Sequence, residues 1–320
     1  MLAWLPYESP EAAEKSLGGI PDGVEVQCFT DPAGQWPDSI GEVEFLVPPY
    51  MTGATGLKRI AEMTNLKVVQ LTTAGYDDVL PWIPEGVTLS NGGGIHDAST
   101  AEMALGLMLA RGRRLDSFAR SQAESQWAPQ FGRALADQRV LIIGHGRIGK
   151  AIEARITPFE PASITRVART ARDGVHAFTE LDELLPAADV VVVICPLTEQ
   201  TTGLLDARRL ALLPDDALVV NVARGKVIDT DALVAELNSG RIEAAIDVVD
   251  PEPLPAEHPL WKCPNLLIAP HVGGWSTAYQ PRADAHIARQ LRTFAAGEEL
   301  HTVVAGPNRQ TPGAAAGQQG

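Results

Sequence analysis

The sequence predicts an α/β protein with two domains, and three observations support this expectation. The chain has 320 residues, which is about the length of two ordinary domains. Short apolar runs alternate with helical patterns in two series, one before residue 95 and one after residue 139. The runs of the second series are apolar on both faces, as is typical of parallel strands with helices packed on each side. We therefore expect doubly wound parallel sheets.

The first series predicts a small α/β domain. Its expected elements are strands at residues 43–47, 66–71 and 87–90 and a helix at 53–63. The glycine-rich breaker at residues 91–94 is followed by Asp97 or Ser99 as the N-cap of a long helix over residues 100–118. Because this helix is apolar on nearly every side, we expect it to be buried or to lie at a subunit interface.

The second series predicts a larger α/β domain. Its expected strands span residues 140–143, 164–167, 190–194, 218–222, 244–248 and 266–268, with helical segments between most of them. The chain ends in GPNRQTPGAAAGQQG, which has no apolar periodicity. We expect residues 304–320 to form a disordered tail.

Charge and cysteine content argue against several classes of protein. Lys and Arg number 26 against 40 Asp and Glu, a net charge of -14, and such a surface repels nucleic acids and anionic membranes. The three cysteines have no CxxC spacing and the histidines no ligand spacing, so we expect neither a disulfide framework nor a metal site. No signal peptide or long apolar run is visible, and we expect a cytoplasmic protein.

The segment GHGRIG, Gly144 to Gly149, matches the GxGxxG pattern and stands between a predicted strand and a predicted helix. Gly144 permits a tight turn, Gly146 lets the backbone approach a pyrophosphate, and Gly149 lets the helix pack on the strand. The N–H groups of Arg147 and Ile148 then lie at the positive end of the helix. The alternative is a glycine-rich turn without a ligand. We expect His145, inside this loop, to face solvent.

The residues after the next strand differ from the usual pattern. A carboxylate that binds the ribose 2′-hydroxyl is expected there, but the chain reads Ala168-Arg169-Thr170-Ala171-Arg172. Because arginine binds a 2′-phosphate and a carboxylate repels one, we predict a preference for NADP(H) over NAD(H). Arg169, Thr170 and Arg172 would hold the phosphate. The alternative is that these arginines are only solvated and NAD(H) is used.

Three further segments begin where apolar strands end, and they carry Arg224, Glu252 and His271. In an open α/β sheet, ligands bind outside the carboxyl ends of the strands. The planar fork of Arg224 suits the carboxylate of a 2-oxo acid. His271 can give a proton to the forming alkoxide, and Glu252 can stabilise the imidazolium and fix its tautomer. This set predicts hydride transfer to a small 2-oxo acid, with the cofactor carrying the hydride chemistry.

Together these segments resemble the D-isomer-specific 2-hydroxyacid dehydrogenase family, which includes glyoxylate and hydroxypyruvate reductases. The resemblance extends from about residue 66 to residue 294. It implies that Arg224, Glu252 and His271 are catalytic and that the backbone at Ala74 and Gly75 meets the substrate carboxylate. It also implies that the cofactor lies beside a further set of residues: Pro196, Thr201, Val222, Asp247 and Gly273.

The resemblance further implies two Rossmann-like domains with a cleft between them. Residues 1–95 and 275–303 would form the substrate domain, in which a helix at 283–294 packs, and residues 96–274 the dinucleotide-binding domain. A homodimer through the apolar helix near residues 103–109 is implied as well. Tyr50 and Trp275 are candidates for the substrate side-chain pocket, with ordinary packing as the alternative.

Two other functions stay open at this point. A phosphoglycerate dehydrogenase-like enzyme is possible, although few basic residues are available for a phosphorylated substrate. The family also contains dinucleotide-sensing regulators that are not enzymes. We expect glyoxylate or hydroxypyruvate as the substrate.

Overall fold

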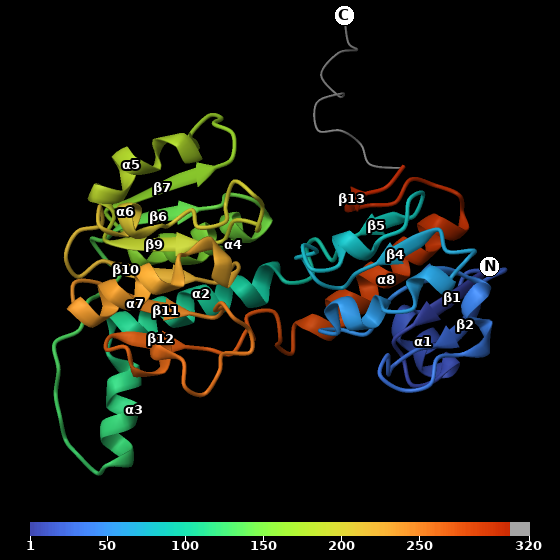
Figure 1. Cartoon of the computed structure of the whole chain (residues 1–320), viewed down its shortest axis with the longest axis horizontal. Coiled ribbons are helices and arrows are strands. Elements are labelled where there is room, and N and C mark those ends of the chain that lie inside the picture. The colour runs from blue at the N-terminus through green and yellow to red at the C-terminus, as the bar shows by residue number, and fades with distance from the viewer. Residues whose placement is uncertain (308–320) are drawn as a thin grey trace, which may run out of the picture. The chain divides into compact units, whose positions relative to one another are not determined.

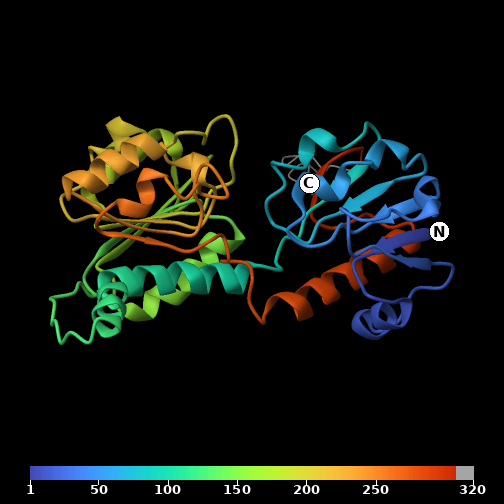
Figure 2. The same cartoon turned by 60° about the horizontal axis from the view of Figure 1, so that its bottom comes forward.

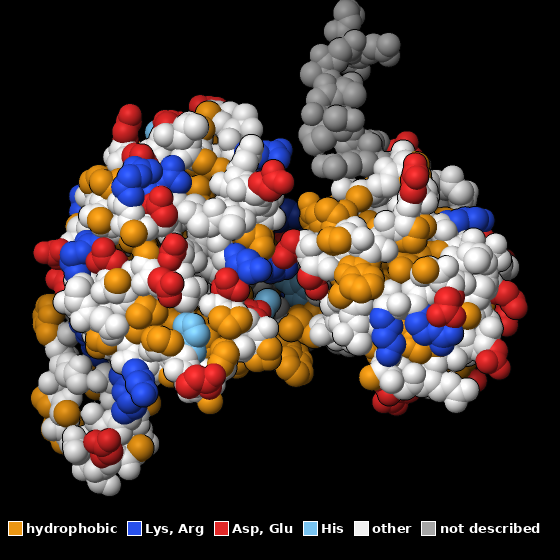
Figure 3. All heavy atoms as spheres, viewed as in Figure 1, with side chains coloured by type: hydrophobic (Ala, Val, Ile, Leu, Met, Phe, Trp, Pro, Cys, Tyr) orange, Lys and Arg blue, Asp and Glu red, His pale blue; other side chains and the backbone are white. Residues whose placement is uncertain are grey.

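A computed structural model of the protein describes residues 1–307, and the chain divides into two compact units. Among the described residues, unit 1 contains Met1–His96 and residues 277–307, and unit 2 contains Asp97–Ser276. Figure 1 shows that each unit has its own sheet with helices around it. On the face seen in Figure 3, acidic side chains are spread over both units. No helix within residues 1–307 is long and apolar enough to cross a membrane.

Unit 1 is built on a six-stranded sheet in the order β13-β5-β4-β3-β1-β2. All neighbouring strands are parallel except β13, which runs antiparallel to β5. The strands are β1 Leu2–Leu5, β2 Glu25–Cys28, β3 Val43–Leu46, β4 Val68–Gln70, β5 Thr88–Ser90 and β13 Val303–Ala305. The helices are α1 Pro10–Leu17, α8 Tyr279–Ala295 and the 3-10 turns η1 Asp38–Gly41, η2 Gly53–Leu57, η3 Ile60–Glu62 and η4 Leu80–Trp82.

Both faces of the unit 1 sheet are covered. Ile287 and Leu291 of α8 pack with Phe45 and Val68 on one face, and Figure 2 shows α8 lying along that sheet. On the other face, an aromatic cluster around Trp4 packs with Leu46 and Val69. Because α8 follows residue 276, the last part of the chain completes the core of the first part.

Unit 2 is built on a seven-stranded parallel sheet in the order β12-β11-β10-β9-β6-β7-β8. The strands are β6 Arg139–Ile143, β7 Ser163–Ala168, β8 His176–Ala177, β9 Val190–Val193, β10 Leu218–Asn221, β11 Glu243–Ile246 and β12 Leu266–Ile268. The α-helices are α2 Asp97–Gly112, α3 Leu115–Ala123, α4 Arg147–Ile156, α5 Leu181–Leu184, α6 Ala207–Leu210 and α7 Thr230–Ser239. The 3-10 turns are η5 Thr157–Phe159, η6 Phe178–Glu180, η7 Leu185–Ala187, η8 Gly225–Val227 and η9 Pro259–Lys262.

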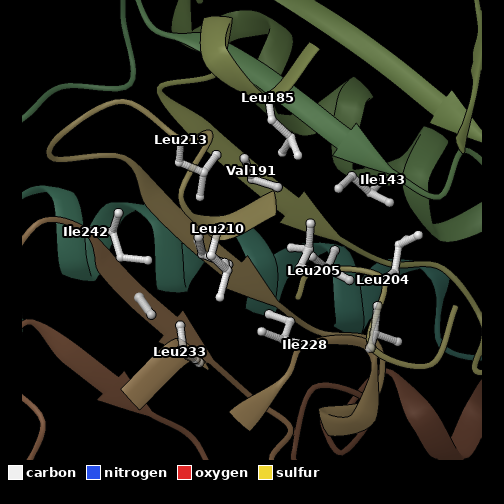
Figure 4. Close-up of a cluster of buried hydrophobic side chains, with 14 of the residues drawn as sticks. Ile143, Leu185, Val191, Leu204, Leu205, Leu210, Leu213, Ile228, Leu233 and Ile242 are labelled. Carbon is white, nitrogen blue, oxygen red and sulfur yellow. The ribbon is translucent and has the colours of Figure 1, made fainter. Parts of the chain in front are cut away.

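Successive residues of the central strands point into two different cores of unit 2. Val191 and Val193 face a cluster that includes Leu205 and Leu233, part of which is drawn in Figure 4. Val190 and Val192 face the cluster made with α2 and α4, which lie together on one side of the sheet in Figure 2. A strand buried on both faces must be apolar throughout. The prediction of an α/β fold with parallel sheets is confirmed.

The direction of strand addition reverses between β6 and β9. The chain adds β7 and β8 on one side of β6 and then adds β9 to β12 on the other. Such a switch point leaves a crevice at the carboxyl ends of the strands, where ligands bind in open α/β sheets.

Several predicted elements differ from the structure. Residues 53–63 form two 3-10 turns instead of one helix, because the segment holds two glycines and Gly53 has a positive φ of 49°. The helix predicted to reach residue 118 ends at Gly112, and Arg114 at φ 62° separates it from α3. The tail predicted from residue 304 begins too early, since Val304 and Ala305 belong to β13. The rest of that prediction, from residue 308, lies outside the described residues.

Candidate active site

Arg224, Glu252 and His271 follow three neighbouring strands of unit 2. Arg224 comes after β10, Glu252 after β11 and His271 after β12. These strands are parallel and adjacent, so their carboxyl ends lie at the same edge of the sheet. The sequence prediction that these segments share an edge is therefore met by the topology.

His271 and Glu252 form a directly bonded pair. The Nδ1 atom of His271 lies 2.7 Å from Oε2 of Glu252, and both side chains are 34% exposed. The other carboxylate oxygen accepts a hydrogen bond of 2.9 Å from the Val249 N–H. Because a carboxylate accepts, Nδ1 carries the proton of this bond. The pair thus fixes the ring and leaves Nε2 for proton exchange.

The pKa of Glu252 is lowered from its ordinary value. Burial alone raises it, but the hydrogen bonds from His271 and from the Val249 N–H, with the nearby charges of His271 and Arg224, outweigh burial. The carboxylate is therefore charged at neutral pH and can stabilise a protonated imidazole.

Asp247 holds the loop that carries His271. Its backbone oxygen accepts from the His271 N–H at 2.7 Å, and its two carboxylate oxygens accept from Val272 and Gly273, each at 2.8 Å. Burial raises the pKa of Asp247 against these two hydrogen bonds, which lower it. A Cβ on Gly273 would lie 2.7 Å from Oδ2 of Asp247. The loop therefore packs closely around a 3% exposed carboxylate.

His271 itself adopts a left-handed backbone conformation, with φ of 54°. This conformation is uncommon for residues other than glycine, although asparagine, aspartate and histidine adopt it more often than the rest, and it costs about 1 kcal/mol or more. Strain at the proposed proton donor is maintained by the surrounding hydrogen bonds of Asp247 and Glu252.

The Arg224 segment packs against the Glu252 segment without room for a side chain. A Cβ on Gly225 would lie 1.9 Å from the Val249 oxygen, so only glycine fits at this position. Arg224 is half-buried and donates from Nη1 to the Ala223 oxygen at 2.9 Å. Its charge contributes to the lowered pKa of Glu252. The structure thus brings the three predicted catalytic residues together.

The glycine-rich loop joins β6 to α4 as the sequence predicted. Gly144 has φ of 110°, and a Cβ there would lie 2.5 Å from the backbone of Ile194 and Cys195. A Cβ on Gly149 would lie 2.1 Å from the Gly144 oxygen. By contrast, no protein atom lies within 4 Å of a Cβ placed on Gly146. Packing within the chain therefore requires glycine at positions 144 and 149, whereas the space beside Gly146 is open.

The expectation that His145 faces solvent is wrong. Its side chain is 9% exposed, and Nε2 lies 2.6 Å from Oε2 of Glu153 on α4. Glu153 also pairs with Arg166 of β7. The buried Nδ1 atom has no hydrogen-bond partner among the described residues. The hydrogen bond to Glu153 keeps the imidazole of His145 against α4 and away from solvent.

Comparisons with known proteins agree with this geometry. A family profile described as "D-isomer specific 2-hydroxyacid dehydrogenase, NAD binding domain" matches residues 105–273. A glyoxylate reductase from Thermofilum pendens is 35% identical over 249 residues, covering 73% of each chain. A glyoxylate reductase from Pyrococcus horikoshii is 34% identical, covering 94% of this chain and 95% of its own.

A solved structure supports the same assignment. The D-isomer specific 2-hydroxyacid dehydrogenase from Xanthobacter autotrophicus Py2, in complex with NADPH and MES, has a TM-score of 0.77 at 30% identity. It covers 95% of this chain and 98% of its own. The chain belongs to the D-isomer-specific 2-hydroxyacid dehydrogenase family. As a member, it is an oxidoreductase that acts on a CH–OH group with a nicotinamide cofactor.

The glycine-rich loop fits the dinucleotide of this family. No protein atom fills the space beside Gly146, and the preceding residue in the chain, His145, has a buried Nδ1 with no partner among the described residues. The first-turn N–H groups of α4, from Arg147 to Gly149, have no acceptor within the helix and suit phosphate oxygens. The Arg147 guanidinium itself pairs with Asp97 at 3.0 Å.

The residues predicted for the 2′-phosphate follow β7. Arg169, Thr170 and Arg172 are all exposed, and Arg172 donates to the His145 oxygen at 2.7 Å. This bond connects the arginine segment to the glycine-rich loop. The dehydrogenase therefore has two cationic side chains at the strand end where many relatives of the fold carry a carboxylate.

Other residues predicted to lie near the cofactor have mainly internal partners. Thr201 is 2% exposed and donates from Oγ1 to the Pro196 oxygen at 2.7 Å, which shapes the loop after β9. Val222 is buried at the end of β10. Cys195 is 2% exposed and belongs to the hydrophobic core, and burial raises the pKa of its thiol to about 12.

In unit 1, the ring of Tyr50 packs against two other rings. Its ring lies 4.2 Å from that of Tyr279 and 5.6 Å from that of His96, measured between centroids. Trp275, predicted with it, is 68% exposed and belongs to unit 2. Ala74 and Gly75 lie in the loop after β4. The sequence did not predict that Asn91 and Tyr279 contact this loop, by bonds to Ala74 and Thr72. The one signal was the glycine-rich segment that begins at Asn91.

Proposed function

We propose that this dehydrogenase reduces a small 2-oxo acid, with glyoxylate or hydroxypyruvate as the preferred substrate and NADPH as the preferred cofactor. The observation that carries the proposal is the His271–Glu252 pair at 2.7 Å, at the same sheet edge as Arg224. Relatives named glyoxylate reductase support a short substrate side chain. We also propose that unit 1 binds the substrate and that unit 2 binds the dinucleotide.

The chain's own residues then have separate tasks. Bound nicotinamide supplies the hydride that the carbonyl carbon receives in the forward direction. Arg224 holds the substrate carboxylate and polarises the neighbouring carbonyl. His271 gives the proton on Nε2 to the carbonyl oxygen, which becomes the hydroxyl, and takes a proton back in the reverse direction. Glu252 keeps Nδ1 protonated and balances the charge of the imidazolium.

The substrate also needs contacts from unit 1. We assign the N–H groups of Ala74 and Gly75 to the substrate carboxylate and Tyr50 to the substrate side chain. Neither N–H donates to a protein acceptor among the described residues. Backbone N–H groups presented together form a favourable environment for an anion.

The preference for NADPH rests on the segment after β7. Arg169 and Arg172 are exposed, and Arg172 is held to the glycine-rich loop by its bond to the His145 oxygen. Glu153, which contacts His145 of that loop, also pairs with Arg166, so its charge is balanced. Arg169→Ala should raise the KM for NADPH and leave the KM for NADH nearly unchanged. Arg155→Ala, in which the loosely paired Arg155 on α4 is removed, is the control.

We also propose a homodimer formed by unit 2. Trp127 and Phe131 are 98% and 96% exposed, in the segment that follows α3, and Figure 1 shows α3 extending away from the sheet. Large apolar side chains that gather on an exposed surface are typical of protein–protein interfaces, and these two lie four positions apart in one segment. Half-buried Leu105 and Leu109 on α2 would add to it. Light scattering should give the mass of two chains, and a monomer would refute this arrangement.

The function is tested by direct turnover. The purified protein is assayed with NADPH and, separately, NADH against glyoxylate, hydroxypyruvate, pyruvate, 2-oxobutyrate and phenylpyruvate. We expect the largest kcat/KM for one of the first two acids with NADPH. Best turnover with phenylpyruvate would overturn the substrate assignment, and a larger kcat/KM with NADH would overturn the cofactor assignment.

A further inference from the structure

The loop after β4 has an unusual distribution of hydrogen bonds. Four consecutive carbonyl groups, from Thr72 to Gly75, all accept hydrogen bonds from the chain. The donors are His96 Nε2 at 2.8 Å, the Gly92 N–H at 2.7 Å, Asn91 Nδ2 at 2.7 Å and Thr73 Oγ1 at 2.8 Å. These carbonyls are all bonded within unit 1, whereas the N–H groups of Ala74 and Gly75 have no protein acceptor among the described residues.

The first residue of this loop has a second anchor. Thr72 is 4% exposed, and its Oγ1 accepts a hydrogen bond of 3.0 Å from the Tyr279 hydroxyl at the start of α8. A Cβ on Gly92 would lie 2.4 Å from the Thr72 oxygen, so the two segments are in direct backbone contact. Thr72 is therefore held by its carbonyl, its hydroxyl and its packing.

The two side chains that hold Thr72 also hold one another. The rings of His96 and Tyr279 stack almost parallel, with 3° between their planes and 5.5 Å between their centroids. Tyr50 stacks on Tyr279 at 4.2 Å. His96 is 5% exposed, and burial raises the pKa of Tyr279 to about 12, so its hydroxyl stays protonated and can donate at neutral pH.

We propose that His96 and Tyr279 are positioning residues for substrate binding: they hold Thr72 so that the N–H groups of Ala74 and Gly75 point at the substrate carboxylate. The inference rests on the proposed function, since it presupposes a carboxylate substrate at this loop. Neither residue touches the reacting atoms. Their removal changes substrate affinity through the loop and leaves cofactor affinity as it is.

The test is Tyr279→Phe, which removes one hydroxyl and keeps the ring stack. The matched control is Tyr7→Phe, because the Tyr7 hydroxyl donates to Asp284 on the same helix at 2.7 Å and not to the loop after β4. With glyoxylate we expect Tyr279→Phe to raise KM about three- to tenfold, which is the effect of losing one neutral hydrogen bond. The kcat should stay within about twofold of the original value, because a lost binding contact changes KM and not kcat. Tyr7→Phe should leave both at their original values.

A second variant keeps the inference testable through His96. His96→Phe keeps a ring in the stack but removes the donor to the buried Thr72 oxygen, so it should raise KM more than Tyr279→Phe does. His96→Gln restores an N–H donor and should recover part of the loss. Equal KM values for the Phe and Gln variants would overturn the assignment of His96.

A readout without turnover separates this inference from the proposed function. The Gly92 N–H donates to the Thr73 oxygen, so its hydrogen exchange reports whether the loop is held. Exchange should be faster in Tyr279→Phe than in Tyr7→Phe. Unchanged exchange overturns the positioning role, whatever the activity. Faster exchange with an unchanged KM overturns its link to the substrate. Lack of turnover of every 2-oxo acid by the unmodified protein overturns the proposed function alone.

Discussion

The edge of the unit 2 sheet and the loop after β4 in unit 1 are built from different parts of the chain. The candidate site at the sheet edge consists of side chains, since His271 is paired with Glu252 and lies near Arg224. In the loop, the carbonyls of Ala74 and Gly75 accept hydrogen bonds from Asn91 and Thr73, while their backbone N–H groups have no acceptor among the described residues. One substitution can remove a functional group from a site made of side chains. A substitution does not remove a backbone N–H group, so a site made of N–H groups is altered through the residues that fix its conformation.

The largest effect should come from the proton donor. His271→Asn removes the exchangeable proton but tolerates the left-handed backbone at this position, and kcat should fall about a hundred- to ten-thousandfold. The chain offers a matched control in His176, whose Nδ1 also lies 2.7 Å from a glutamate, Glu180. His176→Asn should leave kcat unchanged. A fall of less than tenfold for His271→Asn would mean that this residue is not the proton donor.

A smaller effect is expected when the charge is kept and only its shape is changed. Arg224→Lys retains the cation but loses the planar fork, and kcat/KM should fall about ten- to a hundredfold, as for the loss of one charged hydrogen bond. Arg208→Lys, at an exposed pair with Asp182, is the control. If Arg224→Lys matched the unmodified enzyme, the carboxylate would have to bind elsewhere.

The glycine-rich loop is a second backbone site, and its glycines should separate folding from binding. Gly149→Ala places a Cβ against the Gly144 oxygen and should lower the free energy of unfolding by about 1–3 kcal/mol. Gly146→Ala meets open space and should lower it by less than about 1 kcal/mol, but weaken NADPH binding. Urea unfolding and a cofactor titration distinguish the two. Equal loss of stability would show that Gly146 also serves the fold.

The difference between the two regions also explains what the sequence could predict. The strands of unit 2 were visible because both faces are buried, and Arg224, Glu252 and His271 stood out because each follows such a strand. In unit 1, β1, β2 and α1 were not predicted, since runs such as Leu2–Leu5 are four residues long and give no period to detect. Residues 53–63 were predicted as one helix, but the glycines of this segment interrupt the helix and two 3-10 turns form.

Positioning residues were harder still to predict. His96 and Tyr279 both hold Thr72, but they stand 24 and 207 positions away from it in the chain. Only the folded unit brings them together, and a buried histidine or tyrosine is usually part of a core. The burial of His145 was missed although its partner Glu153 follows on α4, because the sequence does not show which way the imidazole turns. Contacts between distant segments leave no local pattern in a sequence.

The smallest effect concerns the charge of Glu252. Its pKa is lowered in the folded protein, so the carboxylate contributes stability above its ordinary pKa of about 4.3. This contribution is lost as pH falls through the lowered value. The side chain is about one-third exposed, so solvent screens the pair and the gain is at most about 1 kcal/mol.

Glu252→Gln should therefore differ most from the unmodified protein, in the free energy of unfolding, near neutral pH. The difference should shrink below the ordinary pKa, and urea unfolding at several pH values measures it. Glu180→Gln removes the acid of the surface pair with His176 and provides the comparison for stability. At neutral pH only Glu252→Gln should also lower kcat, because in the proposed mechanism only its partner His271 exchanges a proton with the substrate. If both variants kept full activity, the side-chain site would depend on His271 and Arg224 without its carboxylate partner.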